Sequence, residues 1–503
     1  MANNSTDRSG AARVARIKRT RLTIALLVVL AAATGLRLWQ LGHKSLWTDE
    51  AVSVTTTMMP LPQMLATVAH HDAHPPLYYL LLRIFNPRPR AASDAEWRAR
   101  IPSALAGLAS VYLMWSLGQR VIGQRAALAT AALMSISAFL IYYSQEARFH
   151  MLTVMLCLLS WRVLMSCMNS AGGGAAGRTS WQRWLLYSIA SVVGLFSFYY
   201  YAFVIVSQGA FVLIERFTEK RSHLQSWFLA CALAGVLFAP WFVSVVIPRL
   251  GQVRALAPVP SRWAFGGTAL PDAVAELLVG YQPLATSATR ALLYAISGIL
   301  IVSCVLFLGS RRRALTLCLC GALVPFLCLA VFPFTPHRFE SKHLIFATPF
   351  LLLLAGSLWE TSPSRLLPVT ATAVLALANA ASLWVYYHPG VEKEHWKSVS
   401  QYLAEKAATA DGLCLNPHAQ IRFPLGLYAH SPMLPVRAPG AGPVESLAVD
   451  PTIKRIWLVE AYSPISIPNP EVHHWLNAHW KLLEKREWVG LRGLIVVACY
   501  SRR

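Results

Sequence analysis

Eleven long apolar stretches run through this sequence, and they limit the folds open to it more than any other feature. Each is long enough, or nearly so, to cross a lipid bilayer as a helix. Of the 503 residues, 55% are hydrophobic and 14% are charged, which is more apolar surface than a soluble protein needs. We therefore predict a polytopic α-helical membrane protein with about 11 transmembrane helices, near residues 22–40, 101–118, 126–144, 149–168, 184–199, 202–215, 227–247, 289–309, 314–332, 343–359 and 366–387.

Basic residues between these stretches predict how the chain crosses the membrane. Residues 1–21 are polar and basic, and no cleavage pattern follows them, so we expect a cytoplasmic N-terminus. Residues 22–387 then form the transmembrane domain, and residues 41–100 form its long first outer loop. A short tilted span at 75–85 would invert this topology, but we interpret that segment as a helix on the membrane surface. The even-numbered loops become cytoplasmic, and they contain Arg120, Arg125, Arg178, Arg183, Arg216, Lys220, Arg221, Arg311, Arg312, Arg313 and Arg365.

The net charge of +22 is high enough to raise the question of a nucleic-acid partner. Most of the basic residues, however, lie in short loops between apolar stretches, where they set membrane orientation instead. We therefore expect membrane lipids, and no nucleic acid, among the partners.

Residues 388–503 lose the membrane pattern and predict a small periplasmic α/β domain. Helices are expected near 394–408 and 471–483, and strands at 412–415, 455–459 and 493–499. Cys414 and Cys499 each lie in one of these strands. In an oxidising compartment they could form a disulfide or stay as free thiols, and the sequence leaves both alternatives open.

The first unusual polar cluster follows the first span directly. Asp49 and Glu50 are adjacent carboxylates beside Trp47, at the depth where an interfacial aromatic belt is expected. Charged groups near lipid are costly and commonly functional. A hydrated loop is the simplest alternative. Our interpretation is that Asp49 works as a base on the outer face of a membrane enzyme.

Three histidines and an aspartate form a second cluster in the same outer loop: His70, His71, Asp72 and His74. Imidazole and carboxylate groups suit a divalent metal ion, with Asp72 and His74 as candidate ligands, but the spacing matches no standard zinc motif. A helix start capped by Asp72 is a second alternative. We favour a third, in which His74 binds a phosphate, and a divalent metal stays an open cofactor.

Two more clusters of charged residues lie at the outer ends of predicted spans. Arg100 opens the second span, while Glu146 and Arg148 lie at the outer turn between the third and fourth spans. Glu146 and Arg148 are close enough in sequence to pair simply as a structural salt bridge, and we leave that alternative open.

The last cluster places cations where the orientation rule does not expect them. Arg338, Lys342 and His343 precede the tenth span, in a predicted outer loop. Arginine clamps phosphate oxygens and lysine acts as a point charge, so this group suits a lipid-linked phosphate. Binding of anionic lipid headgroups is the alternative.

Together the clusters define an outward-facing cavity with one carboxylate base and several cations. That combination suits transfer of a group from a lipid phosphate to a nucleophile. The sequence has no Walker motif and no GxSxG elbow, which disfavours nucleotide-driven and serine-hydrolase chemistry. The alternative function is a transporter or flippase for an anionic lipid-linked substrate. Its expected signs, mid-membrane charges and internal repeats, are not found in the sequence.

An ordered set of motifs resembles the GT-C superfamily of membrane glycosyltransferases, in its bacterial relatives of protein O-mannosyltransferases and aminoarabinose transferases. The motifs are WTDEA at 47–51, HPPLYY at 74–79, RIPSAL at 100–105, YSQEAR at 143–148, RFESKHL at 338–344 and EHWK at 394–397. The resemblance covers nearly the whole chain. It departs from the superfamily pattern after the acidic pair, where Ala51 stands instead of an aromatic or basic residue, and this leaves the acceptor contacts open.

The resemblance implies an inverting glycosyltransferase that takes a sugar from a polyprenyl-phosphate donor. The acceptor would be a glycan, lipid or protein of the cell envelope, and the active site would face the periplasm from the bacterial inner membrane. Asp49 would deprotonate the acceptor hydroxyl, and Glu50 would assist or orient it. The resemblance further implies that the donor phosphate is held by His74, Arg338, Lys342 and His343, and that the first loop is organised by Arg100, Glu146 and Arg148. Some relatives bind a divalent metal and others do not, and the motifs name neither sugar nor acceptor.

Overall fold

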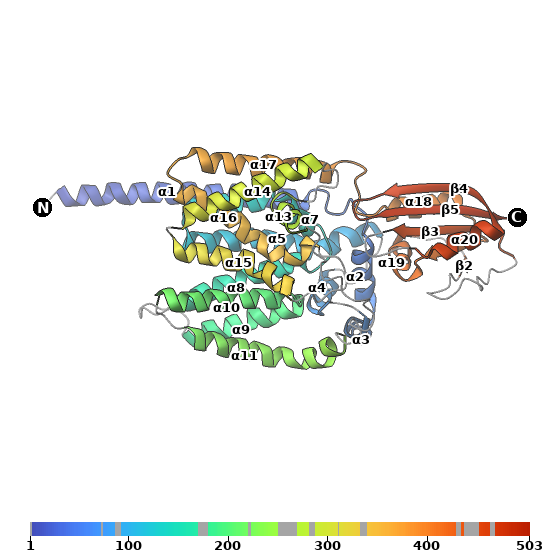
Figure 1. Ribbon diagram of the computed structural model, residues 1–503, viewed down its shortest axis with the longest axis horizontal. Coiled ribbons are helices and arrows are strands. Elements are labelled where there is room, and N and C mark those ends of the chain that lie inside the picture. The colour runs from blue at the N-terminus through green and yellow to red at the C-terminus, as the bar shows by residue number, and fades with distance from the viewer. Residues whose placement is uncertain are drawn as a thin grey trace.

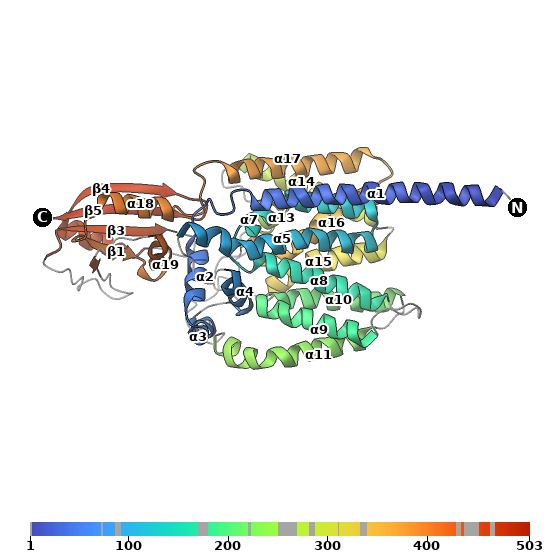
Figure 2. The same cartoon turned by 180° about the vertical axis from the view of Figure 1, so that it is seen from behind.

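The computed structural model of the chain describes residues 3–71, 74–85, 92–169, 180–219, 223–249, 269–280, 287–309, 311–331, 340–428, 434–436, 452–462 and 468–503. A bundle of roughly parallel helices makes up most of the molecule, and a mixed sheet with its own helices stands at one end of the bundle (Figure 1). The N-terminus extends from the opposite end, as the reverse view also shows (Figure 2).

The bundle and its connections contain the following elements in chain order: α1 (Asn3–Leu38), α2 (Thr48–Met58), α3 (Leu61–His71), α4 (Leu77–Phe85), α5 (Ala92–Val121), α6 (Gln124–Ile136), α7 (Ala138–Ser144), α8 (His150–Met168), α9 (Ser180–Ser197), α10 (Tyr201–Glu219), α11 (Leu224–Trp241), the π-helical η1 (Phe242–Val246), α13 (Ala269–Val279), α14 (Ser287–Leu308), α15 (Arg312–Val331), the 3₁₀-helical η2 (Ser341–Ala347), α16 (Thr348–Thr361) and α17 (Leu366–Tyr387). The first outer loop is therefore largely helical, with α2, α3 and α4 packed at the end of the bundle that faces the sheet (Figure 1).

Nine of the described helices are long and apolar enough to cross a membrane, and the pair α6–α7 would make a tenth. This confirms the predicted class, a polytopic helical membrane protein. The predicted span at 184–199 coincides with α9, which is not among the nine, because Gln182 and Arg183 in its first turn lower its mean hydropathy. α9 nevertheless packs beside α8 and α11 in the bundle (Figures 1 and 2).

The predicted span at 126–144 is a broken helix. α6 and α7 meet at an angle of 58°, and Ser137 between them accepts a hydrogen bond from the backbone N–H of Leu140 (3.4 Å). The backbone N–H of Ala138 is freed by the break and donates to the Asn379 side chain of α17 (2.8 Å). A polar side chain from a neighbouring helix thus satisfies the backbone inside the bundle, where water is scarce. The break directs α7 toward the sheet end.

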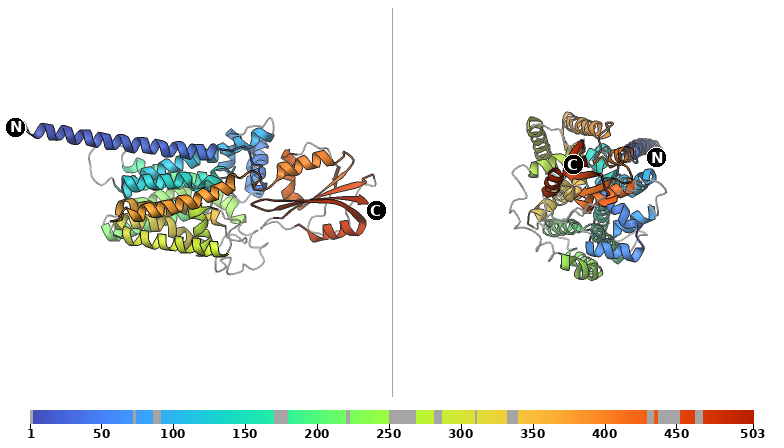
Figure 3. Two further views of the ribbon diagram at one scale, coloured as in Figure 1. Left: turned by 90° about the horizontal axis from the view of Figure 1, so that it is seen from above. Right: turned by 90° about the vertical axis from the view of Figure 1, so that its right-hand side faces the viewer.

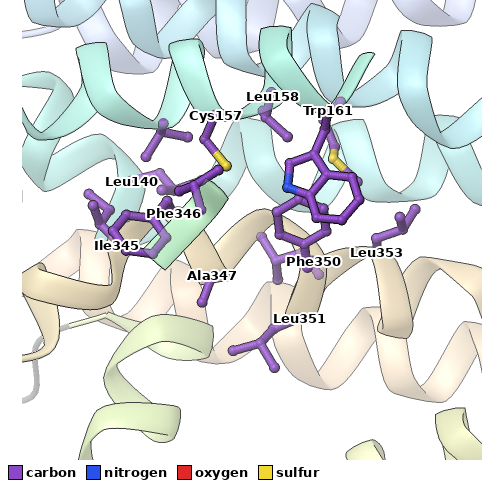
Figure 4. Packing of buried hydrophobic residues seen from close by; sticks show 14 of the residues in the cluster. Leu140, Cys157, Leu158, Trp161, Ile345, Phe346, Ala347, Phe350, Leu351 and Leu353 are labelled. Carbon is purple, nitrogen blue, oxygen red and sulfur yellow. The ribbon is translucent and has the colours of Figure 1, made fainter. Parts of the chain in front are cut away.

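A tightly packed apolar core joins α8 to α16 (Figure 4). The rings of Trp161 and Phe350 lie 5.6 Å apart between centroids, and both side chains are fully buried. Ile345 and Phe346 of η2 are buried in the same core. Because packed interiors resist deformation, the core holds η2 and the residues that begin it in a fixed position.

Basic turns gather at the end of the bundle away from the sheet. Arg311, between α14 and α15, donates to the carbonyl of Ile122 in the turn between α5 and α6. The same end carries Arg365, at the start of α17, and the emerging N-terminal part of α1 (Figures 1 and 3). These arginine-bearing turns thus lie at the end of the bundle opposite the sheet.

The sheet beyond α17 has five strands in the order β2-β1-β3-β5-β4. β1 runs parallel to both β2 and β3, whereas β5 is antiparallel to β3 and to β4. α18 and α19 pack on one face around Trp457, and α20 packs on the other face around Leu458. The bounds are α18 (Trp396–Lys406), β1 (Gly412–Asn416), α19 (His418–Tyr428), β2 (Leu434–Val436), β3 (Arg455–Tyr462), α20 (Pro470–His479), β4 (Trp480–Val489) and β5 (Leu494–Arg502).

One expectation for this part of the chain is wrong, and one alternative that the sequence left open is decided. The helix expected to reach residue 483 ends at His479, and the edge strand β4 follows. β4 is almost wholly exposed and rich in charge, as edge strands commonly are, so it lacks the alternation of a half-buried strand. Cys414 and Cys499 form no disulfide, because β3 lies between their strands and their side chains join cores on opposite faces of the sheet.

Candidate active site

The two adjacent carboxylates at the start of α2 have different environments. Glu50 is fully buried, and Arg100 donates to both of its oxygens, Nε to Oε1 and Nη2 to Oε2, each at 2.8 Å. The backbone N–H of Ala147 also donates to Oε1 (2.7 Å). Asp49 keeps 27% of its side chain exposed, and its Oδ2 lies 3.9 Å from Nη2 of Arg148. Glu50 is therefore engaged within the protein, whereas Asp49 can still contact a ligand.

Arg100 joins Glu50 to the beginning of the first outer loop. Its Nη1 donates to the carbonyls of Leu41 and Lys44, and its Nη2 donates to that of Ser45, at distances of 2.9, 2.9 and 3.0 Å. Burial alone would raise the pKa of the Glu50 carboxyl, but the charges of Arg100 and then Lys393 outweigh it and hold that pKa below its usual value. The buried pair fixes the chain just before Asp49.

Glu146 and Arg148 do not pair with each other through their side chains, so the alternative of a salt bridge between them is wrong. The carboxylate of Glu146 instead accepts from Nζ of Lys393 (3.1 Å), and both side chains are fully buried. Arg148 turns toward α2, where its Nη1 donates to Oγ of Ser53 (3.0 Å). Its Nη2 also lies 3.5 Å from Nδ1 of His74.

Two histidines predicted to hold phosphate lie at the two ends of one aromatic cluster. The His74 ring packs against Phe149, with 4.5 Å between centroids, and lies 6.4 Å from the Phe198 ring. Phe198 contacts Tyr200 (5.0 Å), which in turn contacts His343 edge-to-face (5.4 Å). Segments far apart in the sequence are thereby brought to one wall of the site.

Lys342 is a further predicted phosphate ligand, and in the structure it forms an ion pair with Glu340. Its Nζ lies 3.0 Å from Oε2 of Glu340. Arg492, in the turn between β4 and β5, donates from Nη1 to the same oxygen (2.8 Å). Both cations also lie over the ring of Trp47, at 5.9 Å for Lys342 and 5.0 Å for Arg492. Arg338, the remaining predicted phosphate ligand, lies outside the described residues.

Only one of the two candidate metal ligands is described. Asp72 lies outside the described residues, and within the described ranges no group of three or more His, Cys, Asp or Glu side chains could hold a metal ion. Nδ1 of His74 faces the guanidinium of Arg148. A divalent metal therefore stays open, and no step of the proposed reaction is routed through one.

The segment after α17 holds the first outer loop through hydrogen bonds, and we call this set of contacts the clamp. The sequence did not indicate these contacts. Glu392 accepts from the backbone N–H of Ser45 (2.8 Å). Glu394 accepts from the backbone N–H and the hydroxyl of Thr48 (2.8 and 2.7 Å) and from the indole of Trp396 (2.6 Å). The motif at 394–397 marked this segment as one of interest, but nothing in the sequence indicated its partners.

We expect Glu394→Ala to loosen the docking of the sheet onto the bundle. The substitution leaves two donors of Thr48 and the Trp396 indole without their acceptor, at a cost of about 1–3 kcal/mol. Limited proteolysis and the thermal unfolding midpoint would measure the effect. Glu405→Ala is the matched control, because Glu405 is exposed and accepts a hydrogen bond from Gln401 on the same helix. Equal behaviour of the two variants would contradict the clamp.

A pH dependence follows from the Glu340 carboxylate. Partial burial would raise its pKa, but Lys342 and Arg492 outweigh this and lower the pKa to about 2, from an ordinary 4.5. Between these values the unfolded chain binds a proton that the folded chain does not, so folding stability falls as the pH drops through this window. We expect the difference in unfolding midpoint between the wild type and Glu340→Gln to shrink from pH about 5 to about 3. If the unfolding midpoints of the two proteins changed with pH in the same way, the pairing of Glu340 with Lys342 and Arg492 would be contradicted.

A helical bundle with a mixed sheet docked at one end is an architecture that known membrane proteins share. Residues 73–243 match the family model of dolichyl-phosphate-mannose-protein mannosyltransferases. No curated protein sequence matches the chain.

Solved structures with this fold include a bacterial and an archaeal protein. ArnT from Cupriavidus metallidurans in the apo state superposes with a TM-score of 0.61 and 13% identity, over 94% of this chain and 98% of that one. The same protein bound to undecaprenyl phosphate gives 0.56 and 12%, over 94% and 97%. The oligosaccharyltransferase AglB from Archaeoglobus fulgidus, in complex with an inhibitory peptide and a dolichol-phosphate, gives 0.54 and 12%, over 88% and 69%. The chain thus has the fold of these solved structures, as the resemblance implied.

Proposed function

We propose that the chain is an inverting glycosyltransferase that moves a sugar from a polyprenyl-phosphate donor to a cell-envelope acceptor. The main support is the contrast between the two carboxylates of α2. Glu50 is saturated by Arg100 and Ala147, while Asp49 stays partly exposed beside the cation of Arg148. Two structures of similar fold, titled as complexes with undecaprenyl phosphate and dolichol-phosphate, support a lipid-linked donor.

In this proposal Asp49 is the base of the reaction. The acceptor hydroxyl oxygen attacks the anomeric carbon from the side opposite the phosphate, and its proton passes to Asp49. The bond between the anomeric carbon and the phosphate oxygen breaks, and its electron pair leaves on the polyprenyl phosphate. Attack from the opposite side inverts the configuration at that carbon. Glu50 takes no proton, because its oxygens are engaged, and acts by orienting the start of α2.

The cations and imidazoles around the site stabilise, through charge and hydrogen bonds, the negative charge that builds up on the leaving phosphate. Arg148 and His74 lie on the side of Asp49, and Lys342 and His343 lie across the aromatic cluster. Arg338 keeps its proposed role as a further phosphate ligand. Arg100 and Glu146 serve as positioning residues, since each holds the first loop or the segment after α17.

We further propose that the site faces the periplasm of a bacterial inner-membrane protein. Residues 1–21 would lie in the cytoplasm, residues 22–387 would form the transmembrane domain, and residues 388–503 would form a periplasmic domain. The arginine-rich turns at the end of the bundle opposite the sheet support this orientation.

The test is an assay of the purified protein in detergent with a panel of radiolabelled polyprenyl-phosphate sugars. Release of polyprenyl phosphate on addition of an envelope extract is the expected result. Binding of a donor without any release would favour the transporter or flippase instead. Neither binding nor release across the panel would refute the proposed donor class.

A further inference from the structure

Two cations share a single carboxylate oxygen at the sheet end of the bundle. Nζ of Lys342 and Nη1 of Arg492 both contact Oε2 of Glu340, at 3.0 and 2.8 Å. One negative charge therefore balances two positive charges, and the Glu340 side chain is 32% exposed. This is the arrangement by which proteins grip a phosphate oxygen, with a carboxylate oxygen in its position.

Arg492 reaches this point from the sheet domain, yet the membrane domain fixes its position. Its Nε donates to the hydroxyl of Tyr142 (3.0 Å) and its Nη2 to that of Tyr143 (3.2 Å), both on α7. Its backbone N–H donates to the carbonyl of Lys393 (3.0 Å). A guanidinium carries more N–H groups than these contacts and Glu340 use. Arg492 is therefore held in place with donors to spare.

A buried donor below the two cations is a second, independent sign of a ligand. The indole of Trp47 lies beneath Lys342 and Arg492, and the residue is only 5% exposed. Its Nε1 finds no acceptor in the part of the chain that the structure describes. A buried donor left without a partner is costly, so an acceptor oxygen of a ligand placed close to this indole would be stabilised.

We propose that Glu340 is an exchangeable counter-anion, and that the phosphate of a polyprenyl phosphate replaces it between Lys342 and Arg492. This inference rests on the proposed function and adds Arg492, a residue of the sheet domain, to the phosphate-binding set. Glu340 keeps the two cations paired and in position, so that they need no rearrangement when the lipid arrives. The carboxylate then moves to the solvent from its partly exposed position.

The test is equilibrium binding of undecaprenyl phosphate to the full-length protein in detergent. Glu340→Gln removes the competing charge and keeps the shape, so we expect binding about 3- to 10-fold tighter than in the wild type. Arg492→Ala should weaken binding at least about 10-fold, which corresponds to about 1.4 kcal/mol. Arg492→Lys keeps the positive charge but lacks the planar guanidinium, so its affinity should lie between those of the wild type and Arg492→Ala. Lys481→Ala, at the far end of β4, is the matched control and should bind as the wild type does.

Three results would overturn the inference. Weaker or unchanged binding in Glu340→Gln would show that Glu340 does not compete with the lipid. Unchanged binding in Arg492→Ala would remove Arg492 from the site. An Arg492→Ala/Glu340→Gln double variant that keeps the full gain of Glu340→Gln would show that the two residues act separately.

Folding and donor class are controlled within the same experiment. Unfolding midpoints of all variants show whether weaker binding reflects lost structure, and the isosteric Glu340→Gln variant tests the exchange independently of Arg492. If the wild type itself binds no undecaprenyl phosphate, the proposed donor class fails together with the inference. If the wild type binds but the variants do not differ, the inference alone fails.

Discussion

Under the proposed function, we expect the replacement of Asp49 by asparagine to lower glycosyl transfer by at least about 100-fold and to leave donor binding nearly unchanged. An amide has the same shape as the carboxylate but cannot accept the proton of the acceptor hydroxyl, and a positioned base contributes about this much or more. The side-chain contact of Asp49 with Arg148 is long (3.9 Å) and Asp49 is partly exposed, so we expect the fold to tolerate the loss of its charge. Turnover with a radiolabelled donor and the dissociation constant for undecaprenyl phosphate are the two measurements.

The split between turnover and binding makes this prediction specific. Glu405→Gln, an exposed carboxylate on α18, is the control and should retain full turnover. An Asp49→Asn protein with activity within a few-fold of the wild type would exclude Asp49 as the base. Equal loss of binding and turnover would instead indicate a structural role for this carboxylate.

Replacing Arg100 by alanine should have the largest effect on stability, a loss of about 3–5 kcal/mol. The substitution leaves Glu50 as an unpaired charge in a fully buried position and removes the donors to three carbonyls of the first loop. We expect a low yield of monodisperse protein and a large drop in the thermal unfolding midpoint in detergent.

A second variant shows whether the unpaired charge is the cause. Glu50→Gln added to Arg100→Ala removes that charge, so the double variant should be more stable than Arg100→Ala alone. Arg365→Ala, exposed at the other end of the bundle, should change stability by no more than about 0.5 kcal/mol. If Arg100→Ala lost no more stability than Arg365→Ala, the buried pair of Arg100 and Glu50 would not contribute to the stability of the fold.

Hydropathy predicted most of the membrane domain because each span carries its own signal. It could not predict the break at Ser137, since the freed N–H of Ala138 is satisfied by Asn379, which lies 241 positions away in the sequence. In the sheet domain, β1, β3 and β5 were expected because they are buried and apolar. The edge strand β4 was missed because its exposed, charged residues resemble those of a helix surface.

In the candidate site, too, single residues could be recognised from the sequence, whereas contacts between distant residues could not. Asp49, Arg100 and Lys342 stood out because each carries charge at a membrane boundary. Residues that pair across long sequence distances could not be recognised in this way. Arg492 lies 152 positions beyond its partner Glu340, and Lys393 lies 247 positions beyond its partner Glu146. Sequence motifs singled out candidate residues, whereas only the fold shows that Glu146 pairs with Lys393 and not with Arg148.

The clamp between the first outer loop and the segment after α17 also sets an order of events in biosynthesis. Asp49 leaves the ribosome near the start of synthesis, whereas Lys393, Glu394 and Arg492 follow every membrane helix in the chain. The site can therefore form only after all spans have been inserted and the sheet has paired β4 with β5. Under the proposed function, a nascent chain that already carries Asp49 would be inactive until then, and insertion would be complete before a donor could be bound and cleaved.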